Sequence, residues 1–504
     1  MRKNLFYSAL LLTLANLLLR AVSMGFQVYL AGRVGATGIG LLQLVLTVSA
    51  MAVTVGTSGI RVAGMYLCAE ELGRSSRGGV RAVMRLCLGY ALVVSILAGA
   101  GLFALSPTIA QRWIGDLRTV RALRLTGLFL PFTCLTAVMS GYFTAASKVG
   151  RLVAVDILER VASIGLTLLL LCRTAADAEG ACAAIVAGNA IATAAGFFLL
   201  LALYLRDVRG VEAAPMRGRF RKLLGLCVPL ALNEYLRSGL GTLEHLLIPR
   251  GLARSAGDRE QALAAYGAIH GMVFPILFFP TSVLFSLSDL LVPELARCQA
   301  RQDRVRKEHL TDKCLRLGAF YACCVAGGLY CLSEPLAELL YRANAPEVAR
   351  YLRLFAPLVP VLYLDAIVDG MNKGLGQQVI CVRYNTFTSL LDVALLIALL
   401  PRYGIGGYYF SYALTHIVNF ILSIRRLLLV SGWRLRLGFL CKSLICAAAA
   451  CIAAGRLAMS GAGALLGARC GVYLALFLGA ATLLDVLSRE DLTWLRSVVL
   501  PGRE

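Results

Sequence analysis

The chain has 504 residues, of which 59% are hydrophobic and only 15% are charged, and its formal net charge is +22. A soluble protein of this length carries about a quarter charged residues, so the composition excludes a soluble globular protein. Continuous apolar segments recur from end to end, which indicates a polytopic helical membrane protein rather than a β-barrel with alternating strands.

The first apolar segment follows a basic N-terminus and is too long for the core of a signal peptide, so we predict an uncleaved first span. Including it, fourteen segments reach about the 20 residues that are needed to cross the hydrocarbon core. The predicted spans are 5–31, 39–60, 82–106, 120–145, 152–172, 181–205, 223–249, 263–292, 312–332, 348–372, 379–400, 405–428, 438–457 and 464–486.

The basic residues predict the orientation of these spans. With the N-terminus in the cytoplasm, the cytoplasmic segments carry about twice as many Lys and Arg residues as the external ones. Both termini are therefore predicted to be cytoplasmic. The densest basic segments, 206–222 and 297–316, are expected to contact anionic lipid, so the net charge does not indicate nucleic acid binding.

An internal repeat relates the two halves of the chain. Arg20 and Arg33 in the first span correspond to Arg237 and Arg250 in the seventh, with the same spacing of thirteen residues. A charge near the middle of a bilayer costs about 2.5–3.5 kcal/mol, so it usually faces water or protein. A costly residue at matched depth in both halves predicts a two-lobed cavity that carries positive charge.

A second motif supports the repeat, because Arg121-Ala-Leu-Arg124 returns as Arg350-Tyr-Leu-Arg353 at an offset of 229 residues. Spans 1–6 and 7–12 therefore form two copies, and an even number of spans makes the repeat parallel. The predicted organisation is an N-lobe over 1–205, a basic cytoplasmic linker over 206–222, a C-lobe over 223–430, and two further spans with a cytoplasmic tail over 431–504.

Polar residues inside the spans are the candidate substrate-binding residues. Glu234 lies one helical turn from Arg237, and two interpretations remain open: the two charges neutralise one another, or they line the cavity. Arg20 has no acidic residue within one turn of sequence and is the favoured contact for an anion. Glu244 and His270 are further candidates in spans 7 and 8.

Two other groups of residues concern ion binding and motion. Asn385, Ser389 and Asp392 share one helix face and offer oxygen ligands for Na⁺ or a proton site, with ordinary hydrogen bonding between helices as the alternative. Pro275 and Pro280 must bend or loosen span 8, which predicts a hinge, although prolines also occur in membrane helices that do not move.

No soluble-enzyme motif occurs in the sequence, and the four histidines and sixteen cysteines show no metal-ligand spacing. We therefore predict a protein that is not an enzyme and has no metal or cofactor apart from a coupling ion, Na⁺ or H⁺. The cysteines are expected to be small packing residues, and a disulfide between Cys172 and Cys182 remains open. No segment is large enough for a nucleotide-binding domain, so transport would draw on an ion gradient, the membrane potential or downhill lipid movement.

Several segments carry specific motifs. They are Tyr266-Gly-x-x-x-Gly271-Met-x-x-Pro275-x-Leu-x-x-Pro280, Leu291-Val-Pro293, Glu244 with Ile248-Pro249-Arg250, Tyr363 to Gln378, Tyr384-Asn385, Pro401 to Tyr408, and Asn419 with Ser423 to Arg426. Together they resemble the stage V sporulation protein B family. The resemblance covers nearly the whole chain, most specifically residues 229–430. That family belongs to the multidrug/oligosaccharidyl-lipid/polysaccharide exporter superfamily, which also holds the MurJ-type lipid II flippases and the drug exporters.

The resemblance implies two six-helix lobes around a central cavity, alternating access, and a role around peptidoglycan in the cell membrane of spore-forming bacteria, in particular the spore cortex. In MurJ-type relatives, cavity arginines meet the pyrophosphate of the substrate, and spans 13 and 14 form a groove for its lipid tail. Arg20 matches such an arginine by span and depth. Arg61, at the end of span 2, is a further candidate at a position where this family usually has proline.

We therefore expect a flippase for an undecaprenyl-pyrophosphate-linked peptidoglycan precursor such as lipid II. A cation-coupled multidrug exporter of the same superfamily is one alternative. A scaffold that transports nothing and recruits cortex-synthesis enzymes is another. The expected partners are a lipid-linked oligosaccharide, the lipid bilayer and, most directly in the scaffold alternative, cell-wall synthesis enzymes.

Overall fold

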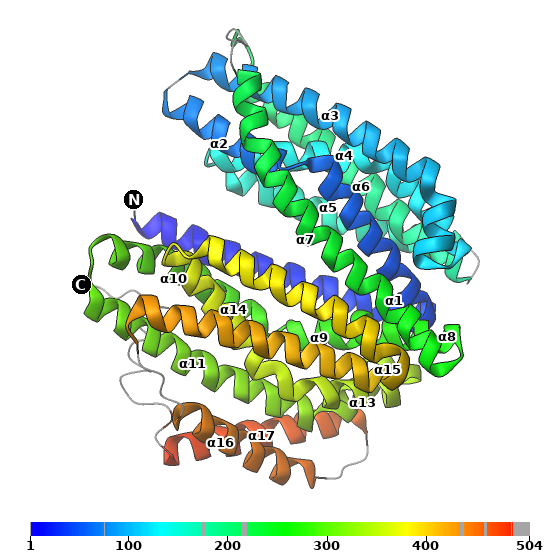
Figure 1. The fold of residues 1–504 in the computed structure, drawn as a ribbon, viewed down its shortest axis with the longest axis vertical. Helices are drawn as coiled ribbons and strands as arrows, with labels where there is room; N and C mark the ends of the chain where they lie inside the picture. Colours follow the sequence, from blue (N-terminus) through cyan, green and yellow to red (C-terminus); the bar gives the residue numbers. More distant parts are fainter. Residues whose placement is uncertain are drawn as a thin grey trace. The chain divides into compact units, whose positions relative to one another are not determined.

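The computed structural model describes residues 2–74, 76–173, 177–212, 219–433, 438–457, 461–484 and 486. Part of the predicted linker (213–218) and most of the predicted tail (487–504) lie outside these residues. Throughout the described ranges the regular structure is helical (Figure 1). The chain divides into two compact units: unit 1 is Met1–Phe26, Arg33–Arg250 and Arg259–Gly267, and unit 2 is Gln27–Gly32, Gly251–Asp258 and Ala268–Glu504.

The helices follow one another with short connections. The first eight are α1 (Arg2–Thr57), α2 (Ile60–Gly73), α3 (Arg77–Thr108), α4 (Val120–Ala145), α5 (Val149–Arg173), α6 (Ala178–Asp207), α7 (Arg219–Ala256) and α8 (Arg259–Gly267), with a π-helix η1 (Ile109–Ile114) and a 3-10 helix η2 (Leu117–Thr119) before α4.

The remaining helices belong to unit 2. They are the π-helix η3 (Ala268–Val273), α9 (Phe274–Phe278), α10 (Thr281–Ala300), α11 (Arg304–Cys331), α12 (Ser333–Tyr341), η4 (Arg342–Asn344), α13 (Ala345–Phe355), η5 (Ala356–Leu358), α14 (Val359–Gly374), α15 (Gln378–Ser431), α16 (Gly438–Gly455) and α17 (Ala462–Leu483).

Within the described residues, ten helical stretches are long and apolar enough to cross a membrane. Two of them each hold two predicted spans, because α1 is kinked at Gly35 and α15 at Gly404, where glycine adopts a backbone conformation that other residues avoid. Helices α5 and α7 fall outside the ten because charged and polar residues interrupt their apolar sequence. All fourteen predicted spans lie on helices, as the sequence indicates.

The core of unit 1 is built by α2, α3, α4 and α6, which lie alongside one another in Figure 1. Close approach between α3 and α4 depends on small residues, since a Cβ on Gly99 would lie 2.4 Å from the carbonyl oxygen of Gly127. Glycine allows the two backbones to touch where a side chain would hold them apart. Fully buried Met84, Cys87 and Phe143 fill the centre of this core.

Helix α7 packs within unit 1, although the sequence repeat pairs it with the second half of the chain. Gly59, between α1 and α2, has a φ of 72°, and a Cβ there would lie 2.9 Å from Cβ of Leu230. Lys222 Nζ forms an ion pair with Glu70 at 2.6 Å. These contacts join α7 to the α1–α2 junction and to the end of α2. The unit in which α7 packs therefore differs from the lobe that the sequence repeat predicts for it. The lobe boundary itself stays a prediction.

The turn before α4 is held from two sides. Arg259 donates to the carbonyl of Ile114 at 3.1 Å, and Gly115 has a φ of 80°. Asp116 accepts from the Arg118 backbone N–H at 2.9 Å and from its guanidinium. Burial opposes ionisation of Asp116, but the Arg118 hydrogen bonds and the charges of Arg118 and Arg259 outweigh it, so the pKa of this carboxyl lies below its usual range.

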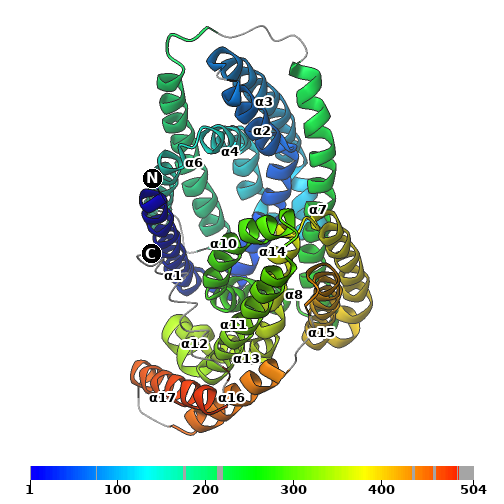
Figure 2. The ribbon, with the colours of Figure 1, turned by 90° about the vertical axis from the view of Figure 1, so that its left-hand side faces the viewer.

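In unit 2, α14 packs against α10, α11 and α15, and α16 and α17 lie side by side against α11 (Figures 1 and 2). The contact with α11 is apolar and centres on Tyr473, which is 2% exposed, and on the fully buried Phe477. The hydroxyl of Tyr473 donates to the carbonyl of Cys324 at 2.8 Å. All sixteen cysteines are free and most are buried, which confirms the packing role and leaves no Cys172–Cys182 disulfide in the described chain.

Candidate functional site

Five of the predicted substrate-binding residues lie in unit 1, on α1, α2 and α7. Arg20, Arg61 and Arg237 are exposed, whereas Glu234 and Glu244 are half-buried. No ion pair joins Glu234 to Arg237 in the described part of this unit, although the two are one turn apart on α7. The guanidinium of Arg237 and the carboxylate of Glu234 therefore make no direct ion pair in this structure.

The orientation of α7, and so of Glu234 and Arg237, is fixed by Tyr235 between them. Tyr235 hydrogen-bonds to the hydroxyl of Ser58, and its own hydroxyl lies 3.3 Å from the carbonyl oxygen of Val55. Both partners belong to the end of α1, where the helix breaks before α2. The break thus provides a hydroxyl and a carbonyl that fix the rotation of α7. The contact of Tyr235 with Ser58 and Val55 could not be predicted from the sequence.

Arg61 differs from the other two arginines in its surroundings. It lies within electrostatic range of Asp156 on α5, whose other charged neighbours are Glu159 and Arg160. Glu159 is itself held by the hydroxyl of Thr193 on α6 at 2.6 Å. The carboxylate of Asp156 partly balances the charge of Arg61, which leaves Arg61 less suited than Arg237 to meet an anion alone.

Glu244 and its neighbour His245 sit where α7 meets α8 within unit 1. His245 Nδ1 lies 3.0 Å from the hydroxyl of Tyr266, and one carboxylate oxygen of Glu244 is fully buried. Tyr266 is fully buried and was part of the sequence motif without an assigned role. Its hydroxyl gives His245 a defined polar partner at membrane depth.

His270 lies in unit 2, in the π-helix η3. Its Nε2 is 3.1 Å from the hydroxyl of Tyr408, and its ring is 4.8 Å from that of Phe274. Phe355 and Tyr412 complete an aromatic cluster around Phe274. The described partners of His270 are therefore aromatic, and its imidazole is oriented by a phenol.

The predicted hinge around Pro275 is a broken helix. Proline has no N–H, so Pro275 cannot donate to the carbonyl one turn before it. Gln27 of α1 supplies the missing donor, with its Nε2 at 2.9 Å from the carbonyl oxygen of Gly271. The hydroxyl of Tyr341 reaches the next carbonyl, that of Met272, at 3.4 Å.

The second break, before Pro280, is bridged by hydroxyl groups. The carbonyl of Leu277 accepts from Tyr363 at 2.6 Å, and that of Pro280 accepts from Tyr321 at 2.9 Å. The two carbonyls between them accept from nearby hydroxyls, Phe278 from Thr281 and Phe279 from Ser282. Four successive backbone carbonyls thus accept from side-chain hydroxyls, and those of Phe279 and Pro280 also accept from a backbone N–H, as is usual where a membrane helix is interrupted.

The predicted ion site on α15 is assembled differently from the expected helix face. Asp392 Oδ1 accepts from Ser411 Oγ at 2.6 Å and lies 3.4 Å from Thr415 Oγ1, both beyond the kink at Gly404. Of the residues predicted to share this site, Ser389 is half-buried and Asn385 is exposed. The structure therefore adds two hydroxyl oxygens on the following helical segment, which a single-helix pattern does not include.

A second buried carboxylate lies in the same unit. Asp365 on α14 accepts from the side-chain amide of Asn419 on α15 at 2.9 Å. Asp365 Oδ1 and Asn419 Oδ1 are both buried with no hydrogen-bond partner. Across the described residues, no cluster of three His, Cys, Asp or Glu side chains suits a metal ion.

Comparison with known proteins places this arrangement in a family. The pattern of the polysaccharide biosynthesis protein family matches residues 5–299, more than half of the chain. The chain belongs to the polysaccharide biosynthesis protein family. Stage V sporulation protein B of Bacillus subtilis (strain 168) is 21% identical over 413 residues, which are 79% of this chain and 78% of that protein. The resemblance predicted from the motifs is thereby confirmed.

Solved structures show the fold. The lipid II flippase MurJ, in an inward closed conformation, matches with a TM-score of 0.71 at 13% identity and covers 94% of this chain and 98% of its own. An inward-facing multidrug resistance MATE family transporter of the MOP superfamily matches with a TM-score of 0.61 at 16% identity, over 82% of this chain and 96% of its own. These neighbours are transporters and flippases rather than enzymes, and the predicted fold class, a polytopic all-α membrane protein of this type, is confirmed.

Proposed function

We propose that this protein is a flippase that moves a lipid-linked saccharide pyrophosphate, such as the peptidoglycan precursor lipid II, across the cell membrane by alternating access, in the service of the spore cortex. The observation that carries the proposal is the match of nearly the whole chain to a lipid II flippase, in a member of the polysaccharide biosynthesis protein family. The match to the MATE transporter leaves a larger share of this chain uncovered.

The charge of the candidate residues fits such a substrate. A lipid-linked pyrophosphate is an anion with a long apolar tail, so it needs cationic groups at membrane depth. Arg20 and Arg237 are both exposed on membrane-depth helices of unit 1. Arginine binds phosphate through two parallel N–H donors, which lysine does not reproduce. The cost of placing each arginine in the membrane, about 2.5–3.5 kcal/mol, would be offset by water or by the bound anion.

Helices α16 and α17 would receive the lipid tail. They lie beyond the repeat and present large apolar side chains outward, with Ile445, Ile452 and Leu478 each about half exposed or more. An apolar surface next to the transport domain offers a polyprenyl chain a place to remain in contact with protein while its headgroup crosses. This assignment supports a lipid substrate over a small soluble one.

The coupling ion would bind at Asp392. Its carboxylate, with the Ser411 and Thr415 hydroxyls, offers oxygen ligands or a proton site of the kind that Na⁺- or H⁺-coupled transporters use. Asn385 and Ser389 on the same helix would complete the ligand set when the site closes. Replacement of Asp392 by Asn should then remove the dependence of transport on the ion gradient.

The test is transport of labelled lipid II by the full-length protein in liposomes. Arg20→Ala should reduce the rate by about tenfold or more, and Arg20→Lys should recover only part of it, because the bidentate geometry is lost. Arg33→Ala, an exposed arginine on the same helix, is the matched control and should transport normally. Full activity of both Arg20 variants in folded protein would refute the phosphate role. Spores without cortex despite normal flipping would instead point to a scaffold.

A cation-coupled multidrug exporter is the second candidate, because the fold also matches a multidrug resistance transporter with a TM-score of 0.61. That function would depend on the carboxylates Asp392 and Glu234 rather than on Arg20. Export of a fluorescent cationic drug that is lost in Asp392→Asn and kept in Arg20→Ala, without lipid II transport, would establish the exporter instead.

A further inference from the structure

The arginine motif that defines the repeat forms the same local structure in both units and has no role in the proposed transport. In unit 1, Arg124 Nε donates to Ser106 Oγ at 3.3 Å, and that hydroxyl donates to the carbonyl of Phe103 at 2.8 Å. In unit 2, Arg353 Nε donates to Ser333 Oγ at 2.8 Å, and Ser333 donates to the carbonyl of Tyr330 at 2.9 Å. Each arginine is thus held by a serine, which lies near the end of α3 in unit 1 and at the start of α12 in unit 2.

In unit 2, the arginine of the motif is bound by an acidic side chain of the protein itself. Glu334 follows Ser333, and its carboxylate forms an ion pair with Arg353. Arg469 of α17 lies 3.9 Å from the other carboxylate oxygen. The motif therefore binds an anionic oxygen group in this unit, which shows the chemistry that the arginine can accept.

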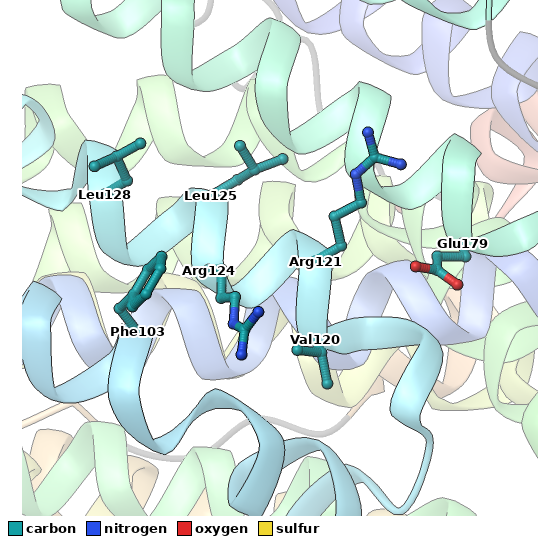
Figure 3. Close-up of a pocket in the computed structure, with 7 residues that line it drawn as sticks. All are labelled: Phe103, Val120, Arg121, Arg124, Leu125, Leu128 and Glu179. Atoms are coloured by element: carbon teal, nitrogen blue, oxygen red, sulfur yellow. The ribbon is translucent and has the colours of Figure 1, made fainter.

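The copy in unit 1 lacks that carboxylate, because Pro107 stands after Ser106 where unit 2 has Glu334. Beside Arg124 is instead a pocket of about 330 Å³ (Figure 3), which is within the size range of ligand pockets. Its lining residues are Phe103, Val120, Arg121, Arg124, Leu125, Leu128 and Glu179. Two arginines and one glutamate leave the pocket with a positive balance.

In Figure 3 the pocket has a polar end at Arg121 and Glu179 and an apolar wall, and the Arg124 guanidinium points away from that of Arg121. Arg121 and Arg124 both project from the first turns of α4, and the Arg124 guanidinium lies over the ring of Phe103 at 5.5 Å (Figure 3). Leu125 and Leu128 continue along α4, and Leu128 is 62% exposed. A free inorganic anion would need only the polar end. A lipid headgroup with its chains attached would use both.

The position of the pocket favours a membrane lipid. It lies where three membrane-length stretches, Arg77–Ile114, Leu117–Ala145 and Ala178–Asp207, reach the same end of unit 1. This end is external in the predicted orientation, and arginines at the end of membrane helices can bind a lipid phosphate through charge-assisted hydrogen bonds. The turn anchored by Asp116 and Arg118 fixes the start of α4 and hence the two arginines.

We propose that this pocket binds the phosphate group of an anionic membrane lipid, with the lipid chain along Leu125 and Leu128. The bound phosphate would occupy, in unit 1, the place that the Glu334 carboxylate occupies beside Arg353 in unit 2. The proposal goes beyond the proposed function and does not depend on what the protein transports. The lipid phosphate could come from a phospholipid of the surrounding leaflet or from a polyprenyl phosphate.

The experiment is titration of the full-length protein in detergent with single lipids, followed by native mass spectrometry. The ligands are phosphatidylglycerol, zwitterionic phosphatidylcholine, a polyprenyl phosphate and inorganic phosphate. We expect phosphatidylglycerol to bind more tightly than phosphatidylcholine, and Arg121→Gln to weaken it by about tenfold, since one charge-assisted contact is lost. Arg350→Gln, the same position of the motif in unit 2, is the matched control and should bind as the wild type does.

A second variant tests the comparison between the units. Pro107→Glu places a carboxylate where unit 2 has Glu334, so it should form an ion pair with Arg124 and displace the lipid while the protein stays folded. Pro107 is exposed, which limits the structural effect of the substitution. Phosphatidylglycerol binding that is unchanged in both Arg121→Gln and Pro107→Glu would overturn the proposal.

The ligand series separates the sources. A higher affinity for the polyprenyl phosphate than for phosphatidylglycerol, sensitive to both variants, would assign the site to a lipid of the transported class. The reverse order would assign it to a structural phospholipid. Inorganic phosphate that competes as well as either lipid would overturn the lipid assignment. If transport does not depend on Arg20 but the lipid still binds in this pocket, the proposed function fails and the proposal for this site stands.

Discussion

Replacement of Tyr363 by Phe should loosen the second break of the α9–α10 segment. The ring of Tyr363 is fully buried, and its hydroxyl donates to the carbonyl of Leu277 at 2.6 Å. The substitution keeps the ring, so no cavity is created, and only the hydrogen bond is removed. A side-chain hydrogen bond contributes about 0.5–1.5 kcal/mol, and in membrane proteins the measured values reach about 1.7 kcal/mol.

Leu277 lies in the last turn of α9, directly before the break that precedes α10, so the loss of this hydrogen bond should cost an amount in the upper part of that range. We expect about 1–1.5 kcal/mol, which is about a five- to tenfold increase in the population of the locally open state. Hydrogen–deuterium exchange of the backbone amides of residues 279 and 281–283, read by mass spectrometry in detergent, measures this population directly.

Tyr321→Phe is the matched control. Tyr321 donates to the carbonyl of Pro280, which also accepts from the backbone N–H of Val283 at 3.2 Å, so the carbonyl keeps a donor after the substitution. Its effect on exchange should be smaller than that of Tyr363→Phe. Equal exchange in the wild type and Tyr363→Phe, or a larger effect in Tyr321→Phe, would refute the role assigned to the Leu277 contact.

Three further predictions concern other parts of the chain. Tyr473→Ala should weaken the packing of α16 and α17 on α11 and destabilise the protein by about 3–5 kcal/mol, whereas Tyr473→Phe should cost only about 1 kcal/mol; thermal unfolding in detergent compares the two, and equal losses would contradict the packing role. Asp116→Asn should lower the free energy of unfolding at pH 7 by about 1 kcal/mol after allowance for solvent exposure, which is read as a lower unfolding temperature. Folding lowers the pKa of Asp116, so the stabilisation by its carboxylate is present above the unfolded pKa of about 3.9 and is lost as the pH falls through the folded pKa. The difference between the variant and the wild type should therefore shrink as the pH falls below about 4. A difference that does not change with pH would contradict the assignment. Asp392→Asn should leave binding of labelled lipid II intact but make its transport in liposomes independent of a Na⁺ or H⁺ gradient; gradient-dependent transport by this variant would exclude Asp392 as the coupling site.

One repeated motif of the sequence has the same local structure in both units. Matched arginines are costly in a membrane, so their spacing reports structure, and the Arg124–Ser106 and Arg353–Ser333 contacts have the same form in the two units. The spans could be predicted for a similar reason, since length and apolarity alone define them.

Packing partners could not be predicted in the same way. Asp392 was expected to share a site with Asn385 and Ser389 on its own helix face, but its hydrogen bonds go to Ser411 and Thr415 beyond the kink at Gly404. The spacing of Ser411 and Thr415, one helical turn, could point to them as partners of Asp392 only after the kink at Gly404 was known. The side chains that bridge the broken helix, such as Gln27 and Tyr363, come from distant parts of the sequence and have no local pattern.

The helix α7 shows the same limit. Its arginines align with α1 in the repeat, but its packing is decided by Tyr235 at the α1 break and by Gly59. A glycine with positive φ is visible in the sequence only as a glycine, so the close approach that it permits could not be predicted.

The proposed function requires that the protein transports a lipid-linked pyrophosphate. The most direct measurement is the rate at which labelled lipid II crosses the membrane of liposomes that contain the purified full-length protein, compared with empty liposomes and with the Arg20→Ala variant. We expect transport above the empty control, in proportion to the amount of protein and lowered by about tenfold or more in Arg20→Ala. No transport of lipid II by folded protein, with or without an ion gradient, would contradict it.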